Sequence, residues 1–356
     1  MYKIDRNLLT GETLKLGDFV IQNQCNKSVI KEHLPELISL NSLLASLAGV
    51  SIDIEPLFWC KDEVKRIYKS NQEKSQMDFW AYIYDNAGVI EEMYNNHSVF
   101  LDSLDFEYYP MQYSFFKGYS KKDITDIILS YFSTFDNKTY NKVKTYFDEN
   151  RIEMDFDEDI NFDGVFYSSK FLNTGYIVCR ENKFNSLTAS IIVHELGHML
   201  DYTTFIYPQQ KRGSIVKDAL LEVPSSFYAT DFSNYLIDKK IDPLGGRLLL
   251  LQDDVLIDEP KNIDMSDDAD VFEEFRSKII YSIGSAFALN LVSLRKEDPK
   301  TFKKKLNDLL TSRKESYLIE DSLDKIGISV SEFVNGERIN DDIKENVKEL
   351  KKKFKY

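Results

Sequence analysis

The stretch that most constrains this chain is SIIVHELGHMLD, residues 190–201, in which His194, Glu195 and His198 form an H-E-x-x-H pattern. Apolar residues recur around the pattern at helical spacing, so the stretch is predicted to be a helix. Residues i and i+4 of a helix point to nearly the same side, which lets both imidazoles bind one metal ion. The chain has only four histidines. Two of them lie here, which favours a metal site over a pair of structural histidines on a buried helix.

The residue between the two histidines gives the pattern its chemistry. Glu195 lies one step around the helix from His194, where its carboxylate can act as general base toward water activated by Zn²⁺. Two histidines do not hold a catalytic zinc, which needs three protein ligands and an open position. The pattern therefore predicts a zinc-dependent peptidase whose third ligand lies elsewhere in the chain.

The third ligand is expected to be a carboxylate if it lies downstream, because no histidine follows His198. Glu222, in the segment LEVPSSF, is the preferred candidate, since it belongs to a separate apolar helix that can pack against the first. Asp201 is the alternative, because it follows His198 by three residues and faces the same side. A carboxylate at that spacing is more often a partner that accepts the N–H of a ligating imidazole.

The composition is that of a globular protein, with 43% hydrophobic and 29% charged residues over 356 positions. The net charge of −14 disfavours nucleic acid and anionic membranes as partners. We identify no apolar run of membrane-spanning length and no signal-peptide core in the charged N-terminus, so we expect a cytoplasmic protein. The three widely spaced cysteines argue against a disulfide framework and against a thiolate metal site.

Helical periodicity dominates the chain on both sides of one β-rich stretch. The predicted helices are 27–50, 61–98 (as one helix or two), 123–135, 138–151, 186–205, 216–238, 248–257, 269–294, 299–313, 319–326 and 331–356. Pro224 indicates either a kink in its helix or a helix start near that position. Gly245-Gly246 is interpreted as a break in the chain. The β-branched and aromatic residues on both sides of Asn173-Thr174-Gly175 predict a β-hairpin.

These elements predict a mainly α-helical fold with a small β-hairpin beside the motif helix. We divide it into a mostly helical N-terminal lobe, residues 1–155, and a catalytic zinc-binding domain, residues 156–356. The hairpin of the second domain is expected at 164–179, and helices make up the rest of its C-terminal part.

The motif and its third ligand together resemble a known family. HELGHMLD followed by LEVPSSF is similar to the thimet oligopeptidase and oligoendopeptidase F family, in which a HExGH helix precedes a Glu-x-Pro/Ala-Ser segment at about this distance. Three further segments are weaker likenesses to the family. They are the hairpin that leads into the motif, the segment IIYSIGSAFALNLV and the segment DSLDKIGISVSEF. The resemblance covers about residues 160–340. Asp201 stands where the family usually has a second histidine, and the family's histidine before its late tyrosine helix has no counterpart after His198.

The resemblance implies a two-lobed, zincin-like fold of the gluzincin type around a channel that admits short peptides. It implies that His194, His198 and Glu222 hold one Zn²⁺ per chain, with Glu195 as general base. Tyr281 matches a family tyrosine that hydrogen-bonds the oxyanion, and its alternative role is ordinary core packing. The hairpin would form one edge of the cleft.

The expected function is therefore that of a zinc-dependent metalloendopeptidase, an oligopeptidase that hydrolyses short peptides. The alternative is a non-catalytic or highly specialised peptide-binding or processing relative with a retained cleft. The residues leave the oligomeric state and the substrate sequence open.

Overall fold

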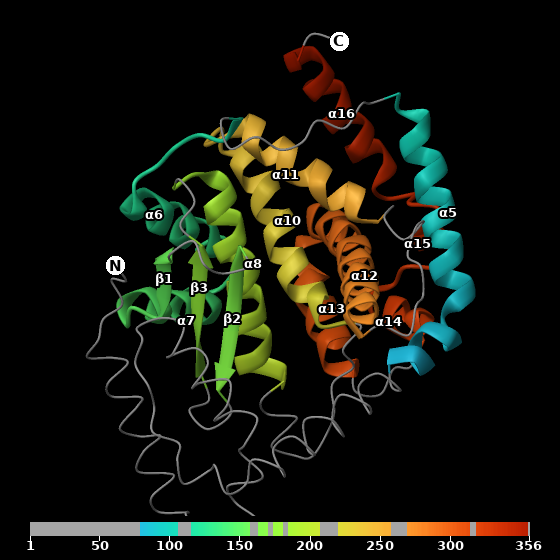
Figure 1. The fold of residues 1–356 in the computed structure, drawn as a ribbon, viewed down its shortest axis with the longest axis horizontal. Helices are drawn as coiled ribbons and strands as arrows, with labels where there is room; N and C mark the ends of the chain where they lie inside the picture. The colour runs from blue at the N-terminus through green and yellow to red at the C-terminus, as the bar shows by residue number, and fades with distance from the viewer. Residues whose placement is uncertain are drawn as a thin grey trace, which may run out of the picture.

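The computed structural model describes residues 79–105, 115–156, 163–169, 174–180, 184–206, 220–257, 269–313 and 318–354 (Figure 1). This part of the chain is mainly α-helical with one small β-sheet, as predicted. The helix predicted over 27–50 and the first half of the helix predicted over 61–98 lie outside the described residues.

The sheet has three strands, and their order across it is β1 (Ile152–Phe156), β3 (Thr174–Arg180) and β2 (Gly164–Ser169). β2 and β3 are antiparallel with Phe166 opposite Ile177, which confirms the predicted hairpin. Asn173 of the predicted turn lies outside the described residues, and Ser169 pairs with Thr174. Thr174 and Gly175 are therefore the first residues of β3, not part of the turn.

β1 is a strand that the sequence did not predict. It pairs in parallel with β3, and its Ile152 and Met154 are buried. Its length of five residues and its acidic neighbours hide the alternation typical of a strand. The division of the chain at residue 155 stays a prediction, although β1 lies across it and pairs with β3.

Three helices are next to the strands in the sequence. α6 (Lys121–Phe132) and α7 (Asn137–Asp148) precede them, and α8 (Ser186–Asp201) follows them. Each begins with a polar side chain that accepts hydrogen bonds from the first turn, which satisfies amides that have no partner within the helix. Ser120 caps α6, Asp136 caps α7 and Asn185 caps α8. α8 packs against β2 and β3, and α6 and α7 pack against α8. The helix that carries the H-E-x-x-H pattern is therefore covered on several sides.

α8 does not end as a regular helix. One turn of π-helix, η2 (Tyr202–Ile206), continues it, so the predicted helix of 186–205 changes its geometry in its last residues. A π-helical turn is uncommon and often lies near a functional site.

A second helix, α10 (Glu222–Asp238), lies between α8 and the long helix α12 (Ala269–Glu297) (Figure 1). Pro224 is in the first turn of α10, where proline removes no helical hydrogen bond. The interpretation of Pro224 as a marker of a helix start is therefore confirmed.

The predicted break at Gly245-Gly246 is wrong. Both glycines lie in the first turn of α11 (Pro243–Leu256). Asp242 accepts a hydrogen bond from the Gly245 amide at 3.0 Å and so acts as the cap of this helix. Pro243 is at its first position, so the sequence Asp-Pro-Leu-Gly starts a helix and does not interrupt one.

The remaining helices are α5 (Ala87–Ser103), α13 (Pro299–Ser312), α14 (Ile319–Ile326), α15 (Val330–Val334) and α16 (Asn340–Phe354). α5 packs against α15, and α16 packs against α11 (Figure 1). The end of α5 also reaches α16, because Lys351 donates a 2.9 Å hydrogen bond to the backbone oxygen of Leu104.

One segment of α12 corrects an expectation about membranes. Within the described residues, Arg276–Glu297 is long and apolar enough to cross a membrane by length and composition. Of its most apolar window, 83% is buried inside the protein. Its apolar side chains pack in the core of this protein, as those of a central helix do.

Candidate metal centre

The structure brings the three predicted metal ligands together. His194 and His198 lie on successive turns of α8, and their ring centroids are 4.9 Å apart. Glu222 reaches them from the first residue of α10. Its Oε2 atom lies 3.2 Å from Nε2 of His194 and 3.2 Å from Nε2 of His198. One carboxylate oxygen thus faces both imidazole nitrogens.

This arrangement fits a zinc ion. Ligand atoms at about 2.0–2.1 Å from a tetrahedral zinc lie roughly 3.3–3.4 Å from each other. The measured Nε2–Oε2 separations of 3.2 Å are close to that value, and the three ligand atoms lie within 4.8 Å of one another. Among the described residues, this is the one cluster of His, Cys, Asp or Glu side chains with such spacing. Three protein ligands are typical of a catalytic zinc site that keeps a position open.

A glycine lets α10 come close enough to α8 for this contact. A Cβ atom at Gly197 would lie 2.6 Å from Cα of Ser225, which is closer than atoms can approach. Ser225 also orients the ligand, because its hydroxyl donates a 2.9 Å hydrogen bond to Oε2 of Glu222. The glycine of H-E-L-G-H and the serine of L-E-V-P-S therefore meet at the contact that places Glu222.

Glu195 points from α8 toward β2. It is 6% exposed, and its carboxylate accepts a hydrogen bond from the backbone N–H of Phe166. A Cβ atom at Gly164 would lie 2.4 Å from Cγ2 of Ile191 and 3.3 Å from Glu195, so only glycine lets the strand lie this close. Burial raises the pKa of Glu195 and outweighs the opposing charges of the two histidines. A raised pKa suits a general base that must later release its proton near neutral pH.

The charges of the ligand cluster support each other in the metal-free protein. Burial of His198 opposes its charged form, but the Glu222 carboxylate raises the pKa of His198 to about 9. Burial likewise opposes ionisation of Glu222, yet the two imidazoles hold its pKa well below the usual range. A carboxylate with a low pKa stays ionised at neutral pH, as a metal ligand must.

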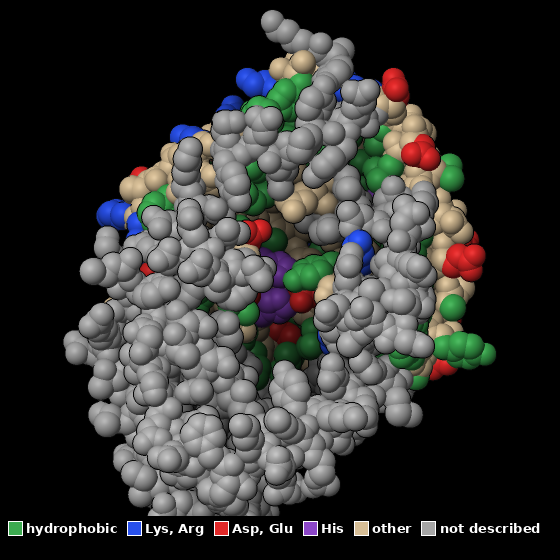
Figure 2. Space-filling model, in the orientation of Figure 1, with side chains coloured by type: hydrophobic (Ala, Val, Ile, Leu, Met, Phe, Trp, Pro, Cys, Tyr) green, Lys and Arg blue, Asp and Glu red, His purple; other side chains and the backbone are tan. Residues whose placement is uncertain are grey.

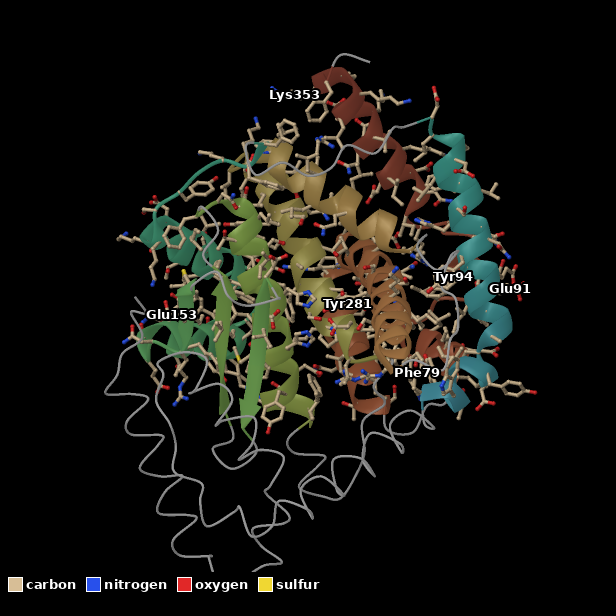
Figure 3. All side chains as sticks on the ribbon, in the orientation of Figure 1. Phe79, Glu91, Tyr94, Glu153, Tyr281 and Lys353 are labelled. Atoms are coloured by element: carbon tan, nitrogen blue, oxygen red, sulfur yellow. The ribbon has the colours of Figure 1, made fainter. Side chains whose placement is uncertain are left out.

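Tyr281 extends from α12 to the same cluster. Its ring stacks on His194 with 6.3 Å between the centroids and 29° between the planes. Figure 3 shows the residue in the middle of the molecule, beside the side chains of α10 and α12. Burial, together with the charges of Glu222 and Glu195, raises the pKa of Tyr281 above its usual value. The phenol therefore keeps its proton and can donate it in a hydrogen bond.

A second close helix contact places that tyrosine. A Cβ atom at Gly284, one turn after Tyr281, would lie 2.8 Å from Cβ of Glu222. Tyr281 as a whole is 38% exposed, which is unusual for a residue that only fills a core. Figure 2 shows histidine side chains at the bottom of a hollow, with acidic side chains beside them.

Asp201 has a different partner from the one that the sequence predicted. Its carboxylate pairs with the guanidinium of Arg313, and both side chains are almost fully buried. No hydrogen bond from Asp201 to an imidazole is found among the described residues. Asp201 also lies outside the group of three ligand atoms. Glu222, and not Asp201, is therefore the carboxylate that joins the two histidines in this group.

Several residues of the site escaped prediction. Ser225 lies inside the segment LEVPSSF, three residues after Glu222. Side chains three residues apart on a helix are neighbours, so this spacing could have predicted the contact between Ser225 and Glu222. Gly164 and Gly284 gave no signal, because their role depends on elements that meet only in the fold. Arg313 is 112 positions from Asp201, and no local pattern connects the two.

Comparisons with known proteins leave the family open. No family model matches the sequence, and no curated protein matches it. Among solved structures, a protein assigned as a peptidase from Chlamydophila abortus has a TM-score of 0.45 and 13% identity over 78% of this chain and 55% of its own. A protein assigned as an oligoendopeptidase F from Bacillus anthracis has a TM-score of 0.45 and 11% identity, over 88% of this chain and 68% of its own. The chain thus spans little more than half of the first of these proteins, and similarity at this level does not identify a family.

Proposed function

We propose that this chain is a zinc-dependent metallopeptidase that hydrolyses short peptides. The observation that carries the proposal is the approach of Glu222 to both histidines at 3.2 Å, with the buried Glu195 next in sequence. The donor set of two imidazoles and one carboxylate suits zinc. A general base beside three ligands has no use in a purely structural metal site.

Each residue has a distinct role in this proposal. The metal ion, when bound, would activate water and polarise the carbonyl of the scissile peptide bond. Glu195 takes a proton from the attacking water and delivers it to the nitrogen of the leaving amine. Tyr281 donates its phenolic hydrogen to the oxygen that becomes negative in the transition state. His194, His198 and Glu222 act as ligands and transfer no proton.

The substrate is expected to bind along β2. This strand lies at the edge of the sheet, and the backbone N–H of Phe166 already reaches Glu195. The free edge of a strand can pair with an extended peptide. A peptide held there would pass the general base, which supports a peptide rather than a compact molecule as substrate.

The test compares the wild type with Glu195→Gln on a quenched fluorescent peptide library, with the zinc content of each protein measured. We expect the variant to keep one zinc per chain and to lose cleavage by about 10³-fold or more, because only the base is removed. Glu92→Gln, an exposed change on α5, is the matched control and should cleave like the wild type. Undiminished cleavage by Glu195→Gln would refute the mechanism.

A second measurement tests the ligand set. Glu222→Ala should reduce the zinc content, whereas a full zinc load would move the third ligand to another carboxylate. If the wild type binds zinc but cleaves no peptide in the library, the alternative of a peptide-binding relative with a retained cleft is favoured.

A further inference from the structure

A second cavity lies on the described part of the chain, apart from the metal centre. It has a volume of about 570 Å³, between α7, the end of α8 with η2, α10 and α13. Neither the three metal ligands nor Glu195 and Tyr281 line it. Sites for small molecules commonly have volumes of about 300–1,000 Å³, so this cavity, the α7–α13 pocket, is large enough for one.

The walls of the α7–α13 pocket are largely apolar and aromatic. Phe135, Phe205, Tyr228, Phe302 and Leu306 line it. Arg295 lies over the Phe135 ring at 3.9 Å. Rigid rings of this kind offer a large apolar contact area at a low cost in side-chain entropy. The pocket is therefore suited to the apolar part of a ligand.

Most charged side chains of the pocket are neutralised by a neighbour. The pairs are Lys303 with Asp136, Arg295 with Asp231, and Arg313 with Asp201. Lys138 and Lys142, both from α7, also line the pocket. No ion pair is found for either of them within the described residues.

Lys142 is the more informative of these two lysines. Its ammonium group donates hydrogen bonds of 3.2 Å to the hydroxyl of Thr203 and 2.8 Å to that of Thr204. It is half-buried, and burial together with the nearby Lys138 lowers the pKa of Lys142. A partly buried cation beside another cation is electrostatically unfavourable, and a bound anion would remove that cost.

We propose that the α7–α13 pocket binds a small carboxylate with an apolar body, whose carboxylate accepts a hydrogen bond from Lys142. The apolar body lies against Phe205 and Phe302. Charge complementarity selects against amines, and a volume of about 570 Å³ is too small for a large anion such as nucleic acid. Leu200 of α8 and Pro224 of α10 line the same pocket, so the ligand touches both helices that carry the metal ligands.

The test is calorimetric titration of the full chain with sodium decanoate, a carboxylate with an apolar tail. We expect saturable binding of one decanoate per chain. Lys142→Met should weaken it by at least about tenfold, since a hydrogen bond to a charged group is lost. Lys144→Met is the matched control, because Lys144 is on the same helix but pairs with Asp148 at 2.5 Å, outside the pocket. It should bind decanoate within about twofold of the wild type.

Two further measurements keep the proposal falsifiable if Lys142→Met does not fold. Asn307→Trp introduces a bulky ring at an exposed residue of the pocket lining and should abolish binding without a change of charge. Decylamine, with the same tail and the opposite charge, should bind at least about tenfold more weakly than decanoate. Absence of decanoate binding to the wild type, equal binding by Asn307→Trp, or equal binding of decylamine would each overturn the proposal. The titration does not require peptidase activity, so its outcome is independent of the proposed function.

Discussion

Replacement of Arg313 by methionine removes a buried cation that connects three parts of the fold. The guanidinium pairs with Asp201 at the end of α8 and donates a 3.1 Å hydrogen bond to the backbone oxygen of Leu220, two residues before Glu222. It also donates a 3.2 Å hydrogen bond to the backbone oxygen of Leu310 on α13. Arg313 is 0% exposed, and the Asp201 side chain is 1% exposed. Water therefore cannot replace the lost contacts.

The magnitude follows from this burial. Removal of one partner from a buried ion pair costs about 3–5 kcal/mol, because the other charge stays uncompensated. Asp201→Leu should cost a similar amount for the same reason. The double variant Asp201→Leu/Arg313→Met leaves no buried charge, and we expect its stability to lie within about 2 kcal/mol of the wild type. The second oxygen of Asp201 has no partner among the described residues, which makes the pair less stabilising and favours recovery in the double variant.

The assay is urea unfolding of the metal-free proteins as a double-mutant cycle, so that bound zinc does not contribute to stability. Arg338→Met is the matched control. Arg338 pairs with Glu297 and Glu332, two partly exposed carboxylates, and its loss should cost about 1 kcal/mol or less. If Arg313→Met costs no more than Arg338→Met, or if the two single changes are additive in the double variant, the reasoning from burial is wrong.

Three further predictions concern the metal centre. Tyr281→Phe should lower kcat by about 10²-fold while KM and zinc content stay unchanged, because in the proposed mechanism the phenol donates only to the transition state. Steady-state kinetics on a single peptide checks this, and a change in KM alone would contradict it. Gly284→Ala should lower both zinc affinity and activity, since the added methyl would lie 2.8 Å from Cβ of Glu222. Gly88→Ala on α5 is the control, because the methyl there meets open space. This variant should keep the zinc affinity and the activity, and should be more stable by about 0.5–1 kcal/mol. In the metal-free protein, the pKa of His198 rises from 6.5 to about 9, so its contribution to stability is full below pH 6.5 and disappears as the pH rises through 9. Zinc competes with the proton on His198, so zinc affinity should rise with pH over the same interval. Zinc titrations at several pH values check this. An affinity that does not change between pH 6.5 and 9 would show that Glu222 does not raise the pKa of His198.

The sequence predicted those parts of the site whose signals are local. The H-E-x-x-H pattern lies on one helix, and its spacing determines that His194 and His198 share a side. Glu222 was predictable because it precedes an apolar helix and because no histidine remained downstream. Pro224 marked the start of that helix correctly, since proline is tolerated in the first turn.

The parts that escaped prediction depend on contacts between distant segments. Gly245-Gly246 suggested a break, but the cap supplied by Asp242 starts a helix there. β1 is too short and too acidic to show strand periodicity. The partner of Asp201 is Arg313, the residue directly after α13. A carboxylate at the spacing of an imidazole partner therefore connects the ends of two helices.

The proposed metal ligands come from two helices, α8 and α10, and this has a consequence for the stability of the fold. His198 and Glu222 are 24 positions apart (222 − 198), so a metal ion between them closes a loop of that length. An ion that binds the folded chain and not the unfolded one stabilises the fold by its binding free energy. Loss of the ion would therefore remove a connection between α8 and α10 as well as the catalytic activity. If the proposed site holds zinc, a chelator is expected to lower the midpoint of thermal unfolding as well as the activity.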